Sequence, residues 1–290
     1  YNYPMTTTND IWIFDIDGVI TDPTTKKIIH PQIIERIEQK LNQKIPVCFN
    51  TGRSSDWVQK TIVTQFKSDT PLEFLFCACE MGNVILQYNQ DNTPRESVHN
   101  ADLIPSQLYA TIKEIVASSY LDSMFVDDTK KSILTIEMKD GFDQDHYEEL
   151  QSRLSGEIRI ILKNYHPGIH VRPSSSNIAI DIKPITSNKE LGAEQILTWL
   201  KTKNLSLDQF QFITFGDSVS DLQMAELFVS QKLSTIFVYV GEDKINQNYG
   251  ILKFLTNPLR FLLWLYLHST PCSSYTLPVQ DQSVLCSPRD

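Results

Sequence analysis

The chain has 290 residues, of which 41% are hydrophobic and 21% are charged, and its formal net charge is −9. This composition is typical of a globular protein, and the length suits one large domain or two of ordinary size. The acidic balance, without any basic run, argues against nucleic acid and anionic membrane surfaces as partners. The N-terminus has no basic segment followed by an apolar one, so we expect no secretory signal.

The apolar runs and the cysteines bear on where the protein resides. The longest apolar run, residues 261–267, is far shorter than the roughly 20 residues that cross a bilayer, and we expect no membrane association. The cysteines are odd in number and scattered, which favours reduced thiols over a disulfide framework. They are Cys48, Cys77, Cys79, Cys272 and Cys286. We therefore predict a cytoplasmic protein.

The first predicted strand, Ile11–Phe14, ends in the sequence Asp15-Ile16-Asp17-Gly18-Val19. Strand alternation directs Asp15 and Asp17 the same way, and Gly18 allows a tight turn. Two neighbouring carboxylates repel unless a cation or a shared proton holds them together. The pattern predicts a magnesium site with a carboxylate nucleophile; a solvated turn is the alternative, because Asp and Gly are common in turns.

The next elements repeat the plan of an apolar strand followed by a helical pattern. The run Pro46–Asn50 is followed by Thr51-Gly52-Arg53, which offers a hydroxyl group and a glycine at a strand end. Helical patterns flank this strand at Pro31–Leu41 and Ser55–Phe66, and a further apolar strand follows at Phe74–Cys77. Such alternation indicates an α/β fold, with a mostly parallel sheet and helices on both faces.

Residues 84–183 break this alternation, and we predict that they form a separate α+β domain inserted into the first. The expected strands are Val84–Tyr88, Ser132–Glu137, Glu157–Leu162, Ile169–Arg172 and Asn177–Ile182, and the expected helices are Pro105–Ala117 and Asp143–Arg153. A polar cluster that includes Arg172 is suited to contact a sugar, or alternatively forms a solvated hairpin.

The last third of the chain returns to the first pattern. Ser187 and Glu190 have the spacing of a capping box, which would begin a helix at Asn188–Leu200 with Lys189 in its first turn. The strand Gln211–Phe215 is followed by a glycine and two acids, Asp217 and Asp221. The remaining expected elements are the helix Asp221–Phe228, the strand Ile236–Val240 and the helix Pro258–Leu267, before a tail at 269–290 that we expect to be disordered.

In this order, the four polar segments resemble the motifs of the haloacid dehalogenase-like superfamily, over roughly the first 250 residues. The insertion point is similar to that of the Cof-type, sucrose-phosphatase-like and phosphomannomutase-like branch. The resemblance implies a Rossmann-like catalytic core, residues 1–83 and 184–268, and an α+β cap domain, residues 84–183, that selects the substrate.

The resemblance also implies a role for each motif residue. Asp15 would be the nucleophile that forms an aspartyl phosphate, and Asp17 the general acid and base. Mg²⁺ would be the cofactor, held by the carboxylates of Asp15 and Asp217 and by the main-chain carbonyl of Asp17, while Asp221 would reach the cation through water or orient Lys189. The phosphoryl oxygens would be bound by Thr51, Gly52 and Lys189. Apart from the resemblance, the positive charges of Arg53 and Arg172 lead us to expect further substrate contacts from them.

These roles together predict a Mg²⁺-dependent phosphatase that acts on a small phosphorylated metabolite, a sugar phosphate. Two alternatives share the site. A phosphomutase would return the phosphoryl group to the sugar, and a non-catalytic protein would only bind a phosphorylated ligand. We expect a small-molecule phosphate ester as the partner, and neither nucleic acid nor membrane.

Overall fold

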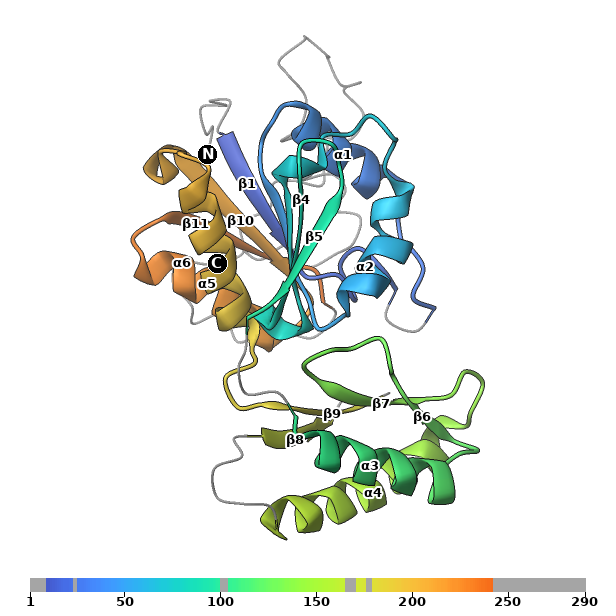
Figure 1. The fold of residues 1–290 in the computed structure, drawn as a ribbon. Helices are drawn as coiled ribbons and strands as arrows, with labels where there is room; N and C mark the ends of the chain where they lie inside the picture. The colour runs from blue at the N-terminus through green and yellow to red at the C-terminus, as the bar shows by residue number, and fades with distance from the viewer. Residues whose placement is uncertain (1–8, 23–24, 100–103, 165–170, 176–178, 242–290) are drawn as a thin grey trace, which may run out of the picture.

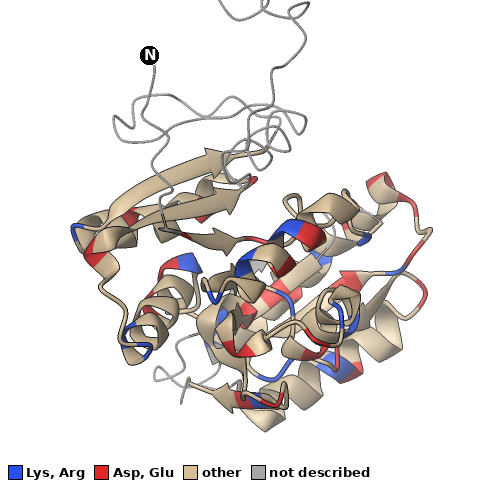
Figure 2. Ribbon diagram, turned by 90° about the horizontal axis from the view of Figure 1, so that it is seen from above, with Lys and Arg blue, Asp and Glu red and all other residues tan. Residues whose placement is uncertain are grey.

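The computed structural model describes residues 9–22, 25–99, 104–164, 171–175 and 179–241. These residues form two lobes, each built on one sheet (Figure 1). We call residues 9–99 and 185–241 the large lobe and residues 104–184 the small lobe. Figure 2 shows Lys and Arg interspersed with Asp and Glu along the described ribbon. In the described part of the chain, no helix is both long enough and apolar enough to cross a membrane.

The large lobe contains a seven-stranded sheet. Its strands lie in the order β11 (Ser234–Tyr239), β10 (Phe210–Gly216), β1 (Asn9–Phe14), β2 (Val47–Asn50), β3 (Leu75–Cys79), β4 (Val84–Tyr88) and β5 (Pro94–Val98). The first five strands run parallel, whereas β4 and β5 form an antiparallel edge. The predicted α/β fold with a mostly parallel sheet is therefore confirmed.

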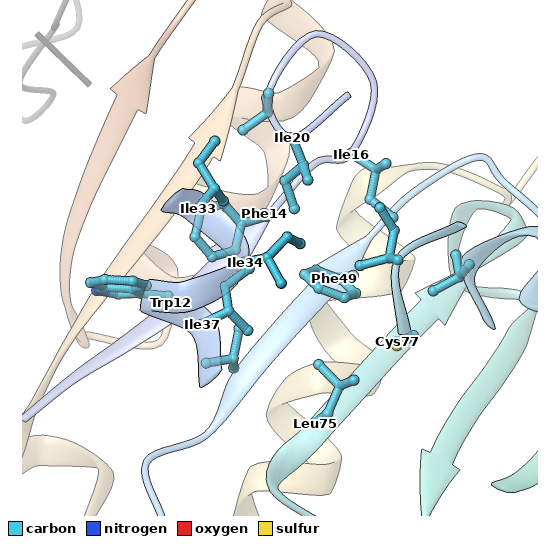
Figure 3. Packing of buried hydrophobic residues seen from close by; sticks show 14 of the residues in the cluster. Trp12, Phe14, Ile16, Ile20, Ile33, Ile34, Ile37, Phe49, Leu75 and Cys77 are labelled. Carbon is cyan, nitrogen blue, oxygen red and sulfur yellow. The ribbon is translucent and has the colours of Figure 1, made fainter. Parts of the chain in front are cut away.

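Helices cover both faces of this sheet. Apolar side chains of β1 alternate: Trp12 and Phe14 pack on the α1 side, and Ile11 and Ile13 on the α5 side. Figure 3 shows Trp12 and Phe14 beside Ile33 of α1. Burying one such side chain contributes about 1.5–3 kcal/mol. The helices are α1 (Pro31–Asn42) and α2 (Ser55–Thr61) on one face, and α5 (Lys189–Thr202) and α6 (Leu222–Ser230) on the other.

Short 3₁₀ turns join several of these elements: Val63–Gln65, Leu72–Phe74, Glu80–Gly82, Leu207–Gln209 and Val219–Asp221. The turn at Glu80–Gly82 leads from β3 directly into β4, and it holds both Glu80 and Met81 at positive φ. This reversal is what makes the pairing of β3 and β4 antiparallel.

The small lobe is a four-stranded antiparallel sheet with helices on one face. Its strands lie in the order β6 (Met124–Val126), β7 (Leu134–Met138), β9 (Ala179–Pro184) and β8 (Val171–Ser175), and its helices are α3 (Ser106–Ser119) and α4 (Gln144–Asn164). Leu134, Ile136, Ile180 and Ile182 are buried together with helix side chains. The other face of the sheet is turned toward the large lobe (Figure 1).

Three sequence expectations are wrong. Val84–Tyr88 is a strand, but it belongs to the large sheet, because the turn after β3 pairs it with β3. Glu157–Leu162 is not a strand, since it continues α4, whose buried residues Tyr147, Leu154 and Ile158 recur at helical spacing. The α5 N-cap is Asn188, whose side chain accepts the Leu191 N–H, rather than Ser187. The expected helix Pro258–Leu267 and the tail 269–290 lie outside the described residues.

Candidate active site

Three of the predicted site residues follow parallel neighbouring strands. Asp15 follows β1, Thr51 follows β2 and Asp217 follows β10, and β1 lies between the other two strands. Because the carboxyl ends of parallel strands meet at one edge of a sheet, these residues face one crevice. That edge is the one facing the small lobe (Figure 1).

A buried lysine stands at the centre of the site. The Nζ atom of Lys189 lies 2.7 Å from Oδ1 of Asp15 and 2.9 Å from Oδ1 of Asp221, and it donates to the main-chain oxygen of Asn50 at 2.7 Å. The side chain of Asn50 donates in return to the main-chain oxygen of Lys189 at 2.7 Å. A Cβ at Gly192 would fall 2.1 Å from the Asn50 side chain, so only glycine lets α5 approach β2 this closely.

Burial and neighbouring charges shift the pKa values of these groups in opposite directions. Burial, with smaller effects from Asp221 and Asp17, raises the pKa of Asp15 well above its usual value, although Lys189 opposes the shift. Burial alone would lower the pKa of Lys189, but Asp15 and Asp221 outweigh it and raise that pKa. Burial and Asp221 raise the pKa of Asp217 to about 6. Three carboxyl groups surround one lysine, so full ionisation of the cluster would leave more negative charge than Lys189 neutralises.

The carboxylates fit a divalent cation. Asp15, Asp217 and Asp221 each place an oxygen within 4.8 Å of the others. Oxygen ligands of this kind suit Mg²⁺, whose charge would offset the excess that Lys189 leaves. Gly18 has a φ of +75°, and a Cβ there would lie 1.9 Å from Oδ2 of Asp217, so glycine is required for the loop to reach this carboxylate.

Asp17 is turned toward an arginine rather than toward the three clustered carboxylates. Arg53 donates from Nε to Oδ2 of Asp17 at 2.9 Å and from Nη2 to Oδ1 at 2.8 Å. The guanidinium also lies 4.8 Å from the ring centre of Trp57, and its Nη1 lies 3.7 Å from Oε1 of Glu137 in the small lobe. Paired hydrogen bonds of this kind fix the plane of the carboxylate as well as its distance.

The loop after β2 is tied to the turn after β3. Thr51 is fully buried, and its hydroxyl oxygen accepts the Arg53 N–H at 3.1 Å. The Met81 N–H donates to the main-chain oxygen of Thr51 at 2.9 Å, and the Met81 side chain lies against Gly52. The backbone of this loop is therefore held in place before any ligand arrives.

Two polar residues of this region, Asn50 and Glu137, are not among the site residues predicted from the sequence. Asn50 is the last residue of a buried strand, and a polar group at such a point was the available signal. Glu137 is an acid in the run Leu134–Met138, at a position that alternation assigns to the face opposite Leu134 and Ile136. Arg172 lies on β8 opposite Lys183, and its side chain lies outside what the structure describes.

Comparisons with known proteins accord with this geometry. A family model described as haloacid dehalogenase-like hydrolase matches residues 12–164. The C-terminal domain of C. albicans trehalose-6-phosphate phosphatase has 14% identity and a TM-score of 0.64, over 90% of this chain and 93% of that chain. A haloacid dehalogenase-like hydrolase from Bacteroides thetaiotaomicron has 13% identity and a TM-score of 0.56, over 84% and 94%.

A third structure, the Plasmodium falciparum IMP-nucleotidase, has 14% identity and a TM-score of 0.53, over 90% of this chain and 61% of that chain. At these identities the likeness shows a shared fold. No curated protein matches the sequence.

Proposed function

The chain belongs to the haloacid dehalogenase-like hydrolase family, and we propose that it is a Mg²⁺-dependent phosphomonoesterase that acts on a small sugar phosphate. The observation that carries this proposal is the pairing of Asp15 with Lys189 beside two further carboxylates, those of Asp217 and Asp221. A phosphate monoester is a dianion, so its hydrolysis depends on charge neutralisation and on placing the attacking oxygen in line.

In the first step, Asp15 attacks phosphorus. Its Oδ1 accepts the Ile16 N–H at 2.7 Å and is paired with Lys189, so Oδ2 is the oxygen left for attack. A bond forms between this oxygen and phosphorus while the bond from phosphorus to the leaving oxygen breaks. Asp17 in its protonated form gives its proton to that leaving oxygen, and an alcohol departs.

In the second step, Asp17 accepts a proton from a water molecule that attacks the aspartyl phosphate. The bond between phosphorus and Asp15 breaks, inorganic phosphate leaves, and both aspartates return to their initial forms. Thr51, Gly52 and Lys189 bind and orient the phosphoryl oxygens through both steps. Carboxylate oxygens of Asp15 and Asp217 and the main-chain oxygen of Asp17, with Asp221 nearby, would hold Mg²⁺, which would supply positive charge to the phosphoryl group.

The leaving group would occupy the space between the lobes. A cavity of about 440 Å³ lies there, lined by Lys189, Asn188 and Gln223 of the large lobe and by Lys183 of the small lobe. Met81, Pro173 and Ile185 also line it, so the cavity offers both polar groups and apolar surface, a mixture that suits a sugar with its hydroxyl groups and its C–H faces. The similar structure named as a trehalose-6-phosphate phosphatase supports a sugar phosphate as substrate. In this proposal the small lobe is the cap, and Arg53 and Arg172 contribute further contacts to the substrate.

A cytoplasmic location is part of the proposal. Cys48, Cys77 and Cys79 are free thiols buried in the large lobe, as expected of a protein in a reducing compartment.

The decisive experiment is a screen of phosphorylated metabolites for phosphate release with and without Mg²⁺. We expect release from sugar phosphates that needs Mg²⁺ and is lost in Asp15→Asn. Conversion of one sugar phosphate into its isomer without free phosphate would identify a phosphomutase instead. Saturable binding of a phosphorylated ligand without any turnover would identify a binding protein.

A further inference from the structure

The side chain of Glu137 reaches from the small lobe into the charged groups of the site. Glu137 lies on β7, on the face turned toward the large lobe, and is only 7% exposed. Its Oε2 accepts from Nζ of Lys26 at 2.9 Å, and its Oε1 lies 3.7 Å from Nη1 of Arg53. Lys26 and Arg53 come from the loops after β1 and β2, so one carboxylate of the small lobe joins both sides of the site.

Arg53 is shared between two carboxylates of opposite lobes. Its Nε and Nη2 edge faces Asp17, its Nη1 faces Glu137, and the ring of Trp57 lies against its plane. The Arg53 side chain is 12% exposed and the Asp17 side chain 30%, so these contacts are partly shielded from solvent. With Lys26, the group contains two positive and two negative charges, and each anion is in contact with a cation.

The strand that carries Glu137 is itself anchored to the large lobe. The buried carboxylate of Glu80 accepts the N–H groups of Lys131, Ser132 and Ile133 at 2.9, 2.7 and 3.1 Å. It also accepts the Ser132 hydroxyl at 2.7 Å. These residues immediately precede β7. The four hydrogen bonds therefore fix the start of the strand against the large lobe, and with it the position from which the Glu137 side chain reaches Arg53.

We propose that Glu137 is a positioning residue, which acts through Arg53 to hold Asp17 in the orientation from which it protonates the leaving oxygen. The inference rests on the proposed phosphatase function. Glu137 fixes one end of the guanidinium, and the other end fixes the plane of the Asp17 carboxylate. Without Glu137, the guanidinium of Arg53 keeps its contact with Asp17 but loses its contact with the small lobe, so the two side chains can move together. Proton delivery then suffers, whereas binding of the phosphoryl group by Thr51, Gly52 and Lys189 does not.

The test compares Glu137→Gln with the unchanged full chain on two substrates of similar size. p-Nitrophenyl phosphate releases a weakly basic phenolate, which needs no proton from the enzyme, whereas benzyl phosphate releases a strongly basic alkoxide, which does. We expect kcat/KM to fall about tenfold or more for benzyl phosphate and less than about threefold for p-nitrophenyl phosphate, since general acid catalysis is typically worth 10²–10⁴-fold. Equal changes for the two substrates, or no change, would overturn the inference.

Two further variants separate positioning from a structural role. Glu137→Asp keeps the charge and should recover part of the benzyl phosphate activity. Lys131→Gln removes a more exposed contact between the lobes, its ion pair with Glu96, and should leave the ratio between the substrates unchanged. Both substrates are measured on one preparation, so partial unfolding lowers both rates alike and leaves the ratio unaffected.

The same measurements separate this inference from the proposed function. An unchanged chain that releases no phosphate from either substrate with Mg²⁺ would contradict the phosphatase proposal, and this inference with it. An active chain whose substrate ratio is the same in Glu137→Gln would contradict the role of Glu137 alone.

Discussion

The two lobes use their sheets differently. The large sheet is covered by helices on both faces, so its polar groups gather at the carboxyl ends of the strands, where Asp15, Thr51 and Asp217 lie. The small sheet is covered on one face only, and Glu137, the last but one residue of β7, lies on the other face. In the large lobe, a polar residue reaches the site because it follows the end of a strand. In the small lobe, a polar residue reaches it because it lies on the face of the sheet that no helix covers.

Among the changes that test this difference between the lobes, a substitution of Asp15 should have the largest effect on activity. Asp15→Asn should reduce phosphate release by at least about 100-fold, because an amide is a poor nucleophile. The matched variant in the small lobe is Asp128→Asn, which alters an exposed aspartate paired with Lys113 and should leave the rate nearly unchanged. Steady-state kinetics on both proteins, with circular dichroism to verify folding, makes the measurement. Substantial residual turnover in Asp15→Asn would exclude it as the nucleophile.

Removal of Mg²⁺ should affect one lobe and spare the other. Chelation should abolish turnover, and excess Ca²⁺ should inhibit it, because Ca²⁺ accepts looser geometry and can engage both oxygens of Asp15. Hydrogen exchange provides a readout independent of activity. Added Mg²⁺ should slow exchange in the segments around Asp15 and Asp217 and leave the helices of the small lobe unchanged. Uniform protection of both lobes, or none, would argue against a cation at this site.

Ion pairs in the two lobes should differ in their contribution to stability. Lys189→Met leaves the buried Asp15 and Asp221 without their cation, and the free energy of unfolding should fall by about 3–5 kcal/mol. Lys113→Met breaks a pair with Asp128 whose side chains are 48% and 61% exposed, and should cost less than about 1 kcal/mol. Urea denaturation measures both, and similar losses would mean that burial does not govern the difference.

The smallest effect concerns a second buried lysine of the large lobe. Burial lowers the pKa of Lys40 to about 8, although Asp10 opposes the shift. The unfolded chain therefore binds more protons than the folded chain between pH 8 and the ordinary lysine pKa of about 10.5, and this group makes the protein more stable as pH rises. The gain should be about 1 kcal/mol between pH 7 and 9.

The matched variant Lys40→Met isolates this contribution. It is needed because burial raises the pKa values of Cys48, Cys77 and Cys79, and their ionisation in the unfolded chain acts in the opposite direction over the same range. The free energy of unfolding of the unchanged chain, minus that of Lys40→Met, should rise by about 1 kcal/mol from pH 7 to pH 9. A difference that is constant with pH would show that Lys40 stays protonated throughout.

The sequence predicted the strand-end residues well because each lies next to its own strand. To predict the positions of Asp15 and Asp217, it was enough to recognise the apolar run before each and to apply the rule that parallel strands end at one edge of the sheet. The pairing of β4 with β3 could not be predicted, because the hydrophobic pattern of residues 84–183 does not show which sheet its first strand joins. The contact between Glu137 and Arg53 depends on how the lobes meet, which local patterns do not encode.

The pairing of β1 with β10 has a consequence for how the chain assembles. Asn9 pairs with Phe210, so closing this pair encloses the whole small lobe in one loop. Strands β6 to β9 find their partners within a short stretch of chain, whereas β1 leaves the ribosome early and must wait for β10. Because distant pairings form slowly, we expect the small lobe to fold first during synthesis, while one side of β1 remains open to chaperones or to aggregation.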